Sequence, residues 1–200
     1  MAIRIVLTFY FLALAFPGKT QSPWHLNKEK NGIKVYSRAT DSSRFHSIKI
    51  EAVFDGTWEK LFAILVDVGH QNKWVYKTKR SHLIKKISKY ELLYYTETEL
   101  PWPMSNRDGA IRMKIFDSPS NIHRIVSLNE PGAIPLTPGL VRLAYYKAVW
   151  EVKSLEKNKI AITYLLDIHP GGGLPPWVVN TFITTGPYET FANLSELLKK

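Results

Sequence analysis

The feature that most constrains the fold of this chain is a long succession of strand-like segments that ends in a single helical stretch. Apolar and polar residues alternate in Phe45–Phe54, where Ile48, Ile50 and Phe54 share one face, as in a strand with one buried side. Comparable segments are Ile33–Arg38, Leu83–Ile87, Tyr90–Glu99, Ala110–Phe116, Ile122–Leu128, Val141–Val152 and Ile160–Ile168. Strands at this spacing predict one antiparallel sheet.

Two helical segments accompany the strands. Thr57 is a suitable N-cap for the first, in which Leu61 and Leu65 recur at helical spacing. The second extends from about Trp177 to Leu198, and Pro187 should kink or split it. This order predicts an α+β helix-grip fold, in which a curved antiparallel sheet wraps around a long C-terminal helix. One helix does not fill such a sheet, so we expect an internal hydrophobic cavity.

Residues 1–22 predict a secretory signal peptide that does not belong to the fold. Arg4 and the amino terminus are positive, Ile5–Phe16 is apolar, and Ala13-Leu14-Ala15 offers a small-residue cleavage site. The apolar run is shorter than the roughly 20 residues that span a bilayer. We therefore expect residues 1–22 to be removed, residues 23–200 to form one domain, and the protein to be exported to the periplasm or secreted.

Cysteine content and charge restrict the chemistry and the partners. The chain has no cysteine, which excludes disulfides, thiol catalysis and cysteine-ligated metals. Its net charge of +10 favours a negatively charged partner. An exported protein meets lipid headgroups more often than nucleic acid. We expect transient contact with an anionic membrane surface, no nucleic-acid partner, and a monomer.

The segment Pro101–Asp108, which reads PWPMSNRD, resembles the signature loop of START domains, the steroidogenic acute regulatory protein-related lipid transfer family. Gly32–Tyr36 (GIKVY) resembles the first strand of the family, and Leu174–Asn180 (LPPWVVN) the start of its C-terminal helix. The similarity extends from about Trp24 to Leu198. The chain is identified as a member of this family, within the Bet v 1-like superfamily of helix-grip folds, and we expect a bacterial member.

The resemblance implies a tunnel for one lipid that is closed by the signature loop and the last helix. The implied lid and membrane-contact residues are Pro101, Trp102, Pro103 and Met104. Tryptophan has an apolar body and a polar N–H, which suits a membrane–water boundary; the alternative is that Trp102 packs beneath the final helix. Asn106, Arg107 and Asp108 complete the motif. Arg107 and Asp108 should point to opposite faces of a strand and fix the loop to the domain.

Strand parity and the family pattern indicate the cavity wall. The candidate ligand-binding residues are Tyr94, Thr96, Thr98, Ile111, Met113, Val178 and Phe182. Several family members carry a cavity arginine where this chain has Met113, and Arg112 should lie on the opposite face. This departure favours a sterol-like or other neutral lipid over a phosphate-bearing one. Ordinary core packing is the alternative role for Met113.

Motifs for catalysis and metal binding are absent from the sequence. Its six histidines form no HxxxH, HxH or HExxH pattern, and there is no P-loop or G-x-S-x-G motif. His46 and His123 begin strands and are expected to be exposed. Glu97 and Glu99 are expected at a strand edge beside lysines. We therefore expect no catalytic residue, metal or cofactor.

The expected function is that of a non-enzymatic protein that binds one hydrophobic lipid, whether sterol-like lipid, neutral lipid or phospholipid, and is a candidate for transferring it. Two alternatives remain: a cyclase- or aromatase-like enzyme on the same fold, and a lipid sensor that acts through a protein partner. The fold alone does not decide between them.

Overall fold

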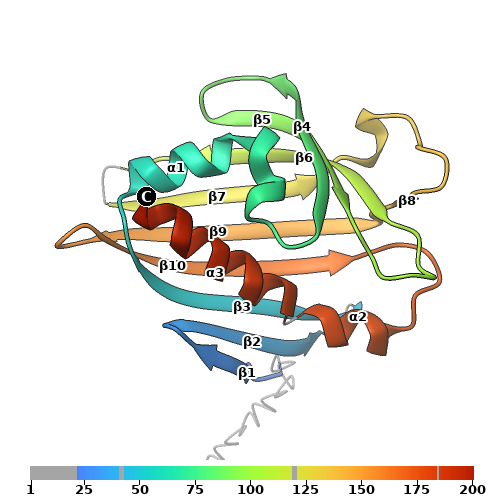
Figure 1. Cartoon of the computed structure of the whole chain (residues 1–200), viewed down its shortest axis with the longest axis horizontal. Coiled ribbons are helices and arrows are strands. Elements are labelled where there is room, and N and C mark those ends of the chain that lie inside the picture. Colours follow the sequence, from blue (N-terminus) through green and yellow to red (C-terminus); the bar gives the residue numbers. More distant parts are fainter. Residues whose placement is uncertain (1–21, 41–42, 119–120, 184) are drawn as a thin grey trace, which may run out of the picture.

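A single large sheet forms the body of the molecule in the computed structural model, which describes residues 22–40, 43–118, 121–183 and 185–200. The strands lie in the order β1-β2-β3-β10-β9-β7-β6-β5-β4, with β8 beside β6 (Figure 1). They are β1 (His25–Lys30), β2 (Ile33–Thr40), β3 (Ser43–Asp55), β4 (Thr78–Lys86), β5 (Glu91–Thr98), β6 (Arg107–Phe116), β7 (Ile122–Asn129), β8 (Val141–Arg142), β9 (Tyr145–Leu155) and β10 (Lys159–His169). All neighbours pair antiparallel except β6 and β8. The antiparallel sheet is confirmed.

Tight turns join β1 to β2 and β9 to β10. Asn31 and Gly32 separate the paired residues Lys30 and Ile33, and both turn residues have positive φ, 52° and 74°. An Asn-Gly pair adopts these angles readily and matches the twist of the flanking strands. The turn predicted at residues 157–159 is also present, between β9 and β10.

The predicted strand Val141–Val152 is wrong in one respect, because the structure divides it into β8 and β9. The backbone N–H of Leu143 donates to the carbonyl of Asp108 on β6, and that of Ala144 donates to the carbonyl of His169 on β10. The chain therefore changes partners between residues 143 and 144. The pattern of side chains along residues 141–152 gives no sign of this change, because backbone hydrogen bonds determine it.

Helices cover one face of the sheet (Figure 1). They are α1 (Trp58–Val66), the 3₁₀ segment η1 (Val68–Lys73), α2 (Pro176–Ile183) and α3 (Thr185–Lys199). A second 3₁₀ segment, η2 (Pro131–Ala133), lies in the loop between β7 and β8. Thr57 caps α1 as predicted, with its hydroxyl accepting from the N–H of Lys60 at 3.4 Å. The C-terminal helical stretch comprises α2 and α3, on either side of residue 184, and Pro187 lies near the start of α3.

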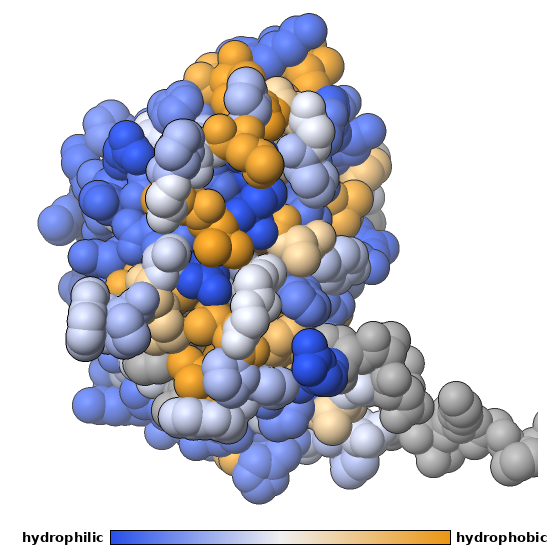
Figure 2. All heavy atoms as spheres, turned by 90° about the vertical axis from the view of Figure 1, so that its right-hand side faces the viewer, coloured by the Kyte–Doolittle hydropathy of each residue, from blue (hydrophilic) through white to orange (hydrophobic). Residues whose placement is uncertain are grey.

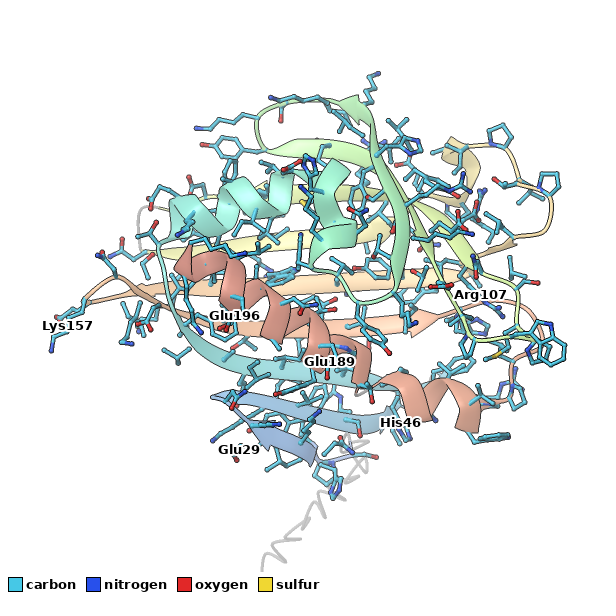
Figure 3. All side chains as sticks on the ribbon, in the orientation of Figure 1. Glu29, His46, Arg107, Lys157, Glu189 and Glu196 are labelled. Atoms are coloured by element: carbon cyan, nitrogen blue, oxygen red, sulfur yellow. The ribbon has the colours of Figure 1, made fainter. Side chains whose placement is uncertain are left out.

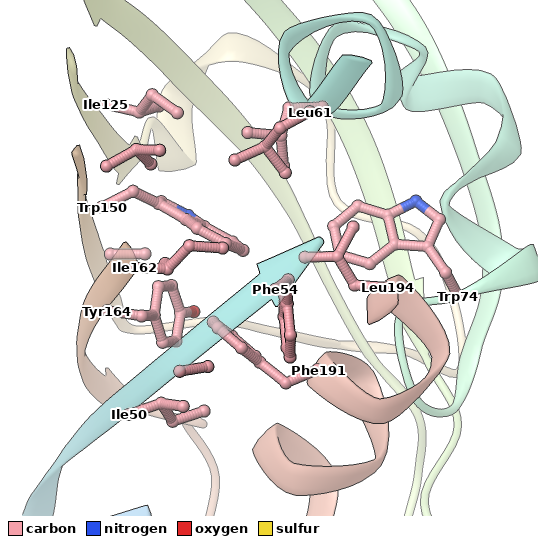
Figure 4. Packing of buried hydrophobic residues seen from close by; sticks show 14 of the residues in the cluster. Ile50, Phe54, Leu61, Trp74, Ile125, Trp150, Ile162, Tyr164, Phe191 and Leu194 are labelled. Atoms are coloured by element: carbon pink, nitrogen blue, oxygen red, sulfur yellow. The ribbon is translucent and has the colours of Figure 1, made fainter. Parts of the chain in front are cut away.

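The main core lies between the sheet and α3. Tyr188, Phe191, Leu194 and Leu198 form the buried face of α3 and follow helical periodicity. The ring of Phe191 stacks on Trp150 with centroids 5.2 Å apart and lies 5.5 Å from the ring of Tyr164 (Figure 4). The C-terminal helix is therefore held to the sheet by aromatic packing.

The expected signal peptide lies almost wholly outside the described residues, so the structure does not bear on it. Among the residues that are described, no helix has the length and apolar character needed to cross a bilayer.

Candidate functional site

A cavity of about 530 Å³ lies between the sheet and the C-terminal helices. Its wall is formed by β5, β6, β9 and β10, by residues 74–78 after η1, by the loop at residues 99–104, and by α2 and α3. Large apolar side chains dominate the wall, among them Trp74, Trp150 and Phe191. The volume is within the range of about 300–1,000 Å³ that small-molecule sites commonly occupy. The arrangement can enclose one apolar molecule.

Most of the residues predicted for the cavity do line it. These are Tyr94, Thr96 and Thr98 on β5, Ile111 and Met113 on β6, and Val178 on α2. Tyr94 and Ile111 are directly paired across the two strands, so their side chains share a face. Phe182 belongs to α2, but its side chain lies outside the described part of the structure.

Arg112 points away from the cavity, as strand parity predicted. Its guanidinium binds Glu130 at 2.6 Å and Glu91 at 2.9 Å. These carboxylates raise the pKa of Arg112, with Glu130 as the stronger partner. Met113 takes the inward position on β6.

The signature loop forms one part of the cavity wall through Pro101, Trp102 and Met104. Pro103 is exposed and lies outside the wall. The side chain of Trp102 is 92% exposed, so it does not pack beneath the final helix. It contributes to the wall while presenting most of its surface to solvent.

The base of the loop is fixed by a buried carboxylate, Glu97. Asn106 donates to Glu97 at 2.9 Å and accepts from the backbone N–H of Leu100 at 3.2 Å. Arg80 donates to the second carboxylate oxygen at 2.7 Å, and Lys79 lies 3.5 Å from the first. Burial opposes ionisation, but these hydrogen bonds and charges outweigh it and lower the pKa of Glu97. Glu97 lies beside Lys79, as expected, but it is buried, because the loop and two cations cover it.

Arg107 and Asp108 hold different parts of the domain, on opposite faces of β6. The guanidinium of Arg107 donates to the carbonyls of Pro170 and Gly171, at 3.4 and 3.3 Å, and to that of Ser105. It also lines the cavity, and burial lowers its pKa. Asp108 instead binds Arg142 at 2.8 Å. Figure 3 shows Arg107 at the end of the sheet opposite Lys157. Arg107 fixes the signature loop, as predicted, and additionally faces the cavity, whereas Asp108 instead holds Arg142 of β8.

Three tyrosines line the cavity, two of them buried and Tyr146 partly buried. They are Tyr94 on β5, Tyr146 on β9 and Tyr164 on β10, and we call them the tyrosine cluster. Burial raises the pKa of all three, so they stay protonated at neutral pH. Gln71 of η1 interacts with the hydroxyl of Tyr94, and the hydroxyls of Tyr146 and Tyr164 interact with each other.

Sequence reasoning did not identify Tyr146, Tyr164 or Gln71. A signal for Tyr146 was present, because it alternates with Ala148 and Trp150 on one face of β9. Gln71 lies in a short 3₁₀ segment, which has no periodic pattern that would reveal an inward side chain.

Three large apolar side chains are exposed at the end of the molecule where the signature loop lies. They are Trp102, Leu136 and Trp177, with exposed fractions of 92%, 77% and 72%, and we call them the apolar rim. The loop at residues 99–106, the loop between η2 and β8, and α2 all lie at this end in Figure 1. Figure 2 faces the same end and shows hydrophobic side chains gathered along its middle.

The expectation that His123 is exposed is wrong. His123 is buried, its ring stacks on Trp58 with centroids 4.0 Å apart, and it pairs with Asp117. His123 is buried because its side chain, near the start of β7, faces α1. Among the described residues, no group of three or more potential metal-ligating side chains comes together.

Comparison with known proteins agrees with this fold and cavity. The START domain family model matches residues 17–200. The chain belongs to the START domain family. The phosphatidylcholine transfer protein of Bos taurus is 27% identical over 170 residues, which cover 82% of this chain and 78% of the relative.

Solved structures show the same architecture. A STAR-related lipid transfer protein from Xanthomonas axonopodis, which is bacterial, superposes with a TM-score of 0.82 and 26% identity, over 88% of this START domain and 99% of that chain. The Zhui aromatase/cyclase from a Streptomyces species shares the fold more distantly, with a TM-score of 0.50 and 8% identity over 76% of this chain and 90% of that one. The START helix-grip architecture is thus confirmed.

Proposed function

We propose that this START domain binds one lipid molecule in its cavity and exchanges it with membranes through the end that carries the apolar rim. The observation that carries the proposal is the combination of an apolar cavity of about 530 Å³ with an exposed tryptophan on the loop that forms its wall. Related proteins are named for lipid transfer, which supports the same role.

The physical basis of exchange is the removal of apolar surface from water. A lipid that leaves a bilayer loses about 25 cal/mol for each Å² of apolar area that becomes wetted. If the apolar rim touches the bilayer while the loop moves, the lipid passes from one apolar environment to another. Tryptophan suits this boundary because its N–H remains hydrogen-bonded while its rings are buried.

We propose binding without catalysis. Burial raises the pKa of Tyr94, Tyr146 and Tyr164, so these hydroxyls are poor bases at neutral pH. They are suited to hydrogen bonding with a ligand, whereas general-base chemistry requires a pKa near the working pH.

The test of the proposed function compares apolar-rim variants in a vesicle-transfer assay. The double variant Trp102→Ser/Trp177→Ser should transfer a fluorescent lipid at least about tenfold more slowly. Burying a large apolar side chain in the membrane contributes about 1.5–3 kcal/mol to the free energy of binding. A difference of about 1.4 kcal/mol corresponds to a tenfold change in affinity. Its melting temperature should change little, since exposed positions usually alter stability by less than about 0.5 kcal/mol.

The matched control is Phe116→Ser, which removes an exposed aromatic side chain from the far end of β6. It should transfer lipid at the rate of the unchanged protein. Equal rates for the double variant and the unchanged protein would contradict the proposed membrane contact. Loss of lipid binding at equilibrium would instead mean that the substitutions damage the cavity.

We further propose that the protein acts outside the cytoplasm, as a periplasmic or secreted monomer. The charge, apolar length and small-residue site of residues 1–22 support export. A reporter fused to residues 1–22 should leave the bacterial cytoplasm. Retention of the fusion in the cytoplasm, with its N-terminus intact, would contradict this proposal.

A further inference from the structure

The tyrosine cluster has unused hydrogen-bonding capacity inside the cavity. Among the described residues, the hydroxyl of Tyr94 hydrogen-bonds with Gln71, and the hydroxyls of Tyr146 and Tyr164 hydrogen-bond with each other. Each hydroxyl thus has one such partner, although a hydroxyl can donate once and accept twice. Buried tyrosine hydroxyls ordinarily have a partner. Three hydroxyls beside a cavity, each with capacity for a further hydrogen bond, indicate a place where an oxygen atom of a ligand binds.

Gln71 completes this polar site. Its amide oxygen accepts from the hydroxyl of Ser81 at 3.2 Å, which leaves the amide N–H groups to interact with Tyr94. The interaction lowers the pKa of Tyr94 against the larger rise from burial, which is the direction expected when the tyrosine oxygen accepts. The proton of the Tyr94 hydroxyl therefore remains available for donation into the cavity.

The positive groups of the cavity wall already have partners. Arg107 donates to three backbone carbonyls, and Lys77 lies 4.0 Å from Glu99. A phosphate beside the tyrosine cluster would lose its hydration without gaining a counter-charge, which is unfavourable. A hydroxyl or carbonyl oxygen loses far less and gains the hydrogen bonds that the cluster offers.

The volume restricts the size of the ligand. A cavity of about 530 Å³ is in the middle of the range of small-molecule sites. This size favours a compact lipid, with one chain or one fused-ring body, over a bulky one.

We propose that the tyrosine cluster and Gln71 bind the hydroxyl or carbonyl end of a neutral lipid that has one chain or one fused-ring body. This inference rests on the proposed lipid-binding function and specifies its ligand class. The polar end lies at Tyr94, Tyr146 and Tyr164, and the apolar remainder occupies the space lined by Trp150, Met113 and Val178.

A ligand series on the purified, delipidated protein tests the inference. The probes are 1-tetradecanol, tetradecane, tetradecyl phosphate and dipalmitoylphosphatidylcholine. Binding is measured by tryptophan fluorescence, since Trp150 lines the cavity, and stoichiometry by native mass spectrometry. We expect one tetradecanol to bind about tenfold more tightly than tetradecane, the effect of one net hydrogen bond of about 1.4 kcal/mol. Tetradecyl phosphate and the phospholipid should bind more weakly than the alcohol.

Each other outcome has a distinct meaning. Equal affinity for tetradecanol and tetradecane would overturn the inference and leave lipid binding intact. Tighter binding of tetradecyl phosphate or of the phospholipid would also overturn it and would point to Arg107 as the polar partner. Failure of all four probes to bind would contradict the proposed function itself.

Conservative variants locate the polar end. Tyr94→Phe/Tyr164→Phe removes two hydroxyls and keeps both rings, and it should lower tetradecanol affinity about tenfold while leaving tetradecane affinity unchanged. The matched control is Tyr145→Phe, which removes an exposed hydroxyl from the opposite face of β9. An unchanged alcohol preference in the double variant, with a melting temperature like that of the control, would overturn the assignment.

Discussion

At the scale of single residues, charged side chains in this START domain fix loops and hydroxyl groups face the cavity. Glu97 is the clearest example of the first role. Its carboxylate joins Asn106 of the signature loop to Arg80 of the neighbouring strand. Because its pKa is lowered in the folded protein, its ionised form stabilises the fold.

Glu97→Gln should therefore weaken the protein at neutral pH and make it less sensitive to acid. A lowered folded pKa contributes stability above the ordinary glutamate pKa of about 4.3, and the contribution is lost as pH falls through the folded pKa. We expect the substitution to lower the free energy of unfolding by about 1–3 kcal/mol at pH 7. The difference from the unchanged protein should become smaller as pH falls from 5 toward 3. Urea unfolding at several pH values measures this difference.

The matched control for Glu97 is Glu156→Gln, at an exposed position in the turn between β9 and β10. It should leave both stability and acid sensitivity unchanged. If Glu97→Gln gives the same pH profile as Glu156→Gln, the buried carboxylate does not anchor the loop.

Gly171 gives a second prediction at this scale. Its φ is +72°, and an added Cβ would lie 2.5 Å from the carbonyl oxygen of Arg142. The left-handed conformation alone costs a non-glycine residue about 1–2 kcal/mol. Gly171→Ala should lower the free energy of unfolding by more than this, because the backbone must also shift. Gly132→Ala, which meets nothing within 4 Å, should stay within about 0.5 kcal/mol. Equal midpoints of urea unfolding for the two variants would contradict this account.

Individual residues were predicted well from the sequence where strand parity applied. Tyr94, Ile111 and Met113 face the cavity because alternation along a strand determines the side. His123 was misjudged because its burial comes from α1, which is distant in sequence. The burial of Glu97 was not anticipated because it depends on how the adjacent signature loop folds back over the strand. The tyrosine cluster was missed because its members come from three strands.

At the scale of elements, α3 is held by its aromatic contact with the sheet. Phe191→Ala removes the ring that lies against Trp150 and Tyr164. It should cost about 3–5 kcal/mol, as truncations of buried aromatic residues do. Val53→Ala, at an exposed position on β3, should cost less than about 1 kcal/mol. Chemical unfolding of both variants tests the contrast.

Elements were predicted from the sequence when one face was clearly apolar. The strand β1 was missed because it is an edge strand with mostly exposed side chains, so it has no alternating pattern. The division of β8 from β9 was missed because backbone partners at residues 143 and 144 determine it. The C-terminal helical stretch was anticipated because its apolar residues recur at helical spacing.

At the scale of the whole molecule, the net charge of +10 predicts salt-dependent transfer. The Debye length falls from about 10 Å at 0.1 M to about 3 Å at 1 M salt. Lipid transfer to anionic vesicles should therefore slow as salt rises, while transfer to neutral vesicles should change little. Identical salt profiles for the two kinds of vesicle would show that the charge does not guide docking.

The contacts of Arg107 have a consequence for how the cavity opens. One guanidinium holds the carbonyl of Ser105 in the signature loop and the carbonyls of Pro170 and Gly171, which lead into α2. One side chain therefore ties the signature loop to the segment that precedes α2. If the protein exchanges lipid as proposed, we expect the two segments to move together and exchange to show a single rate-limiting step.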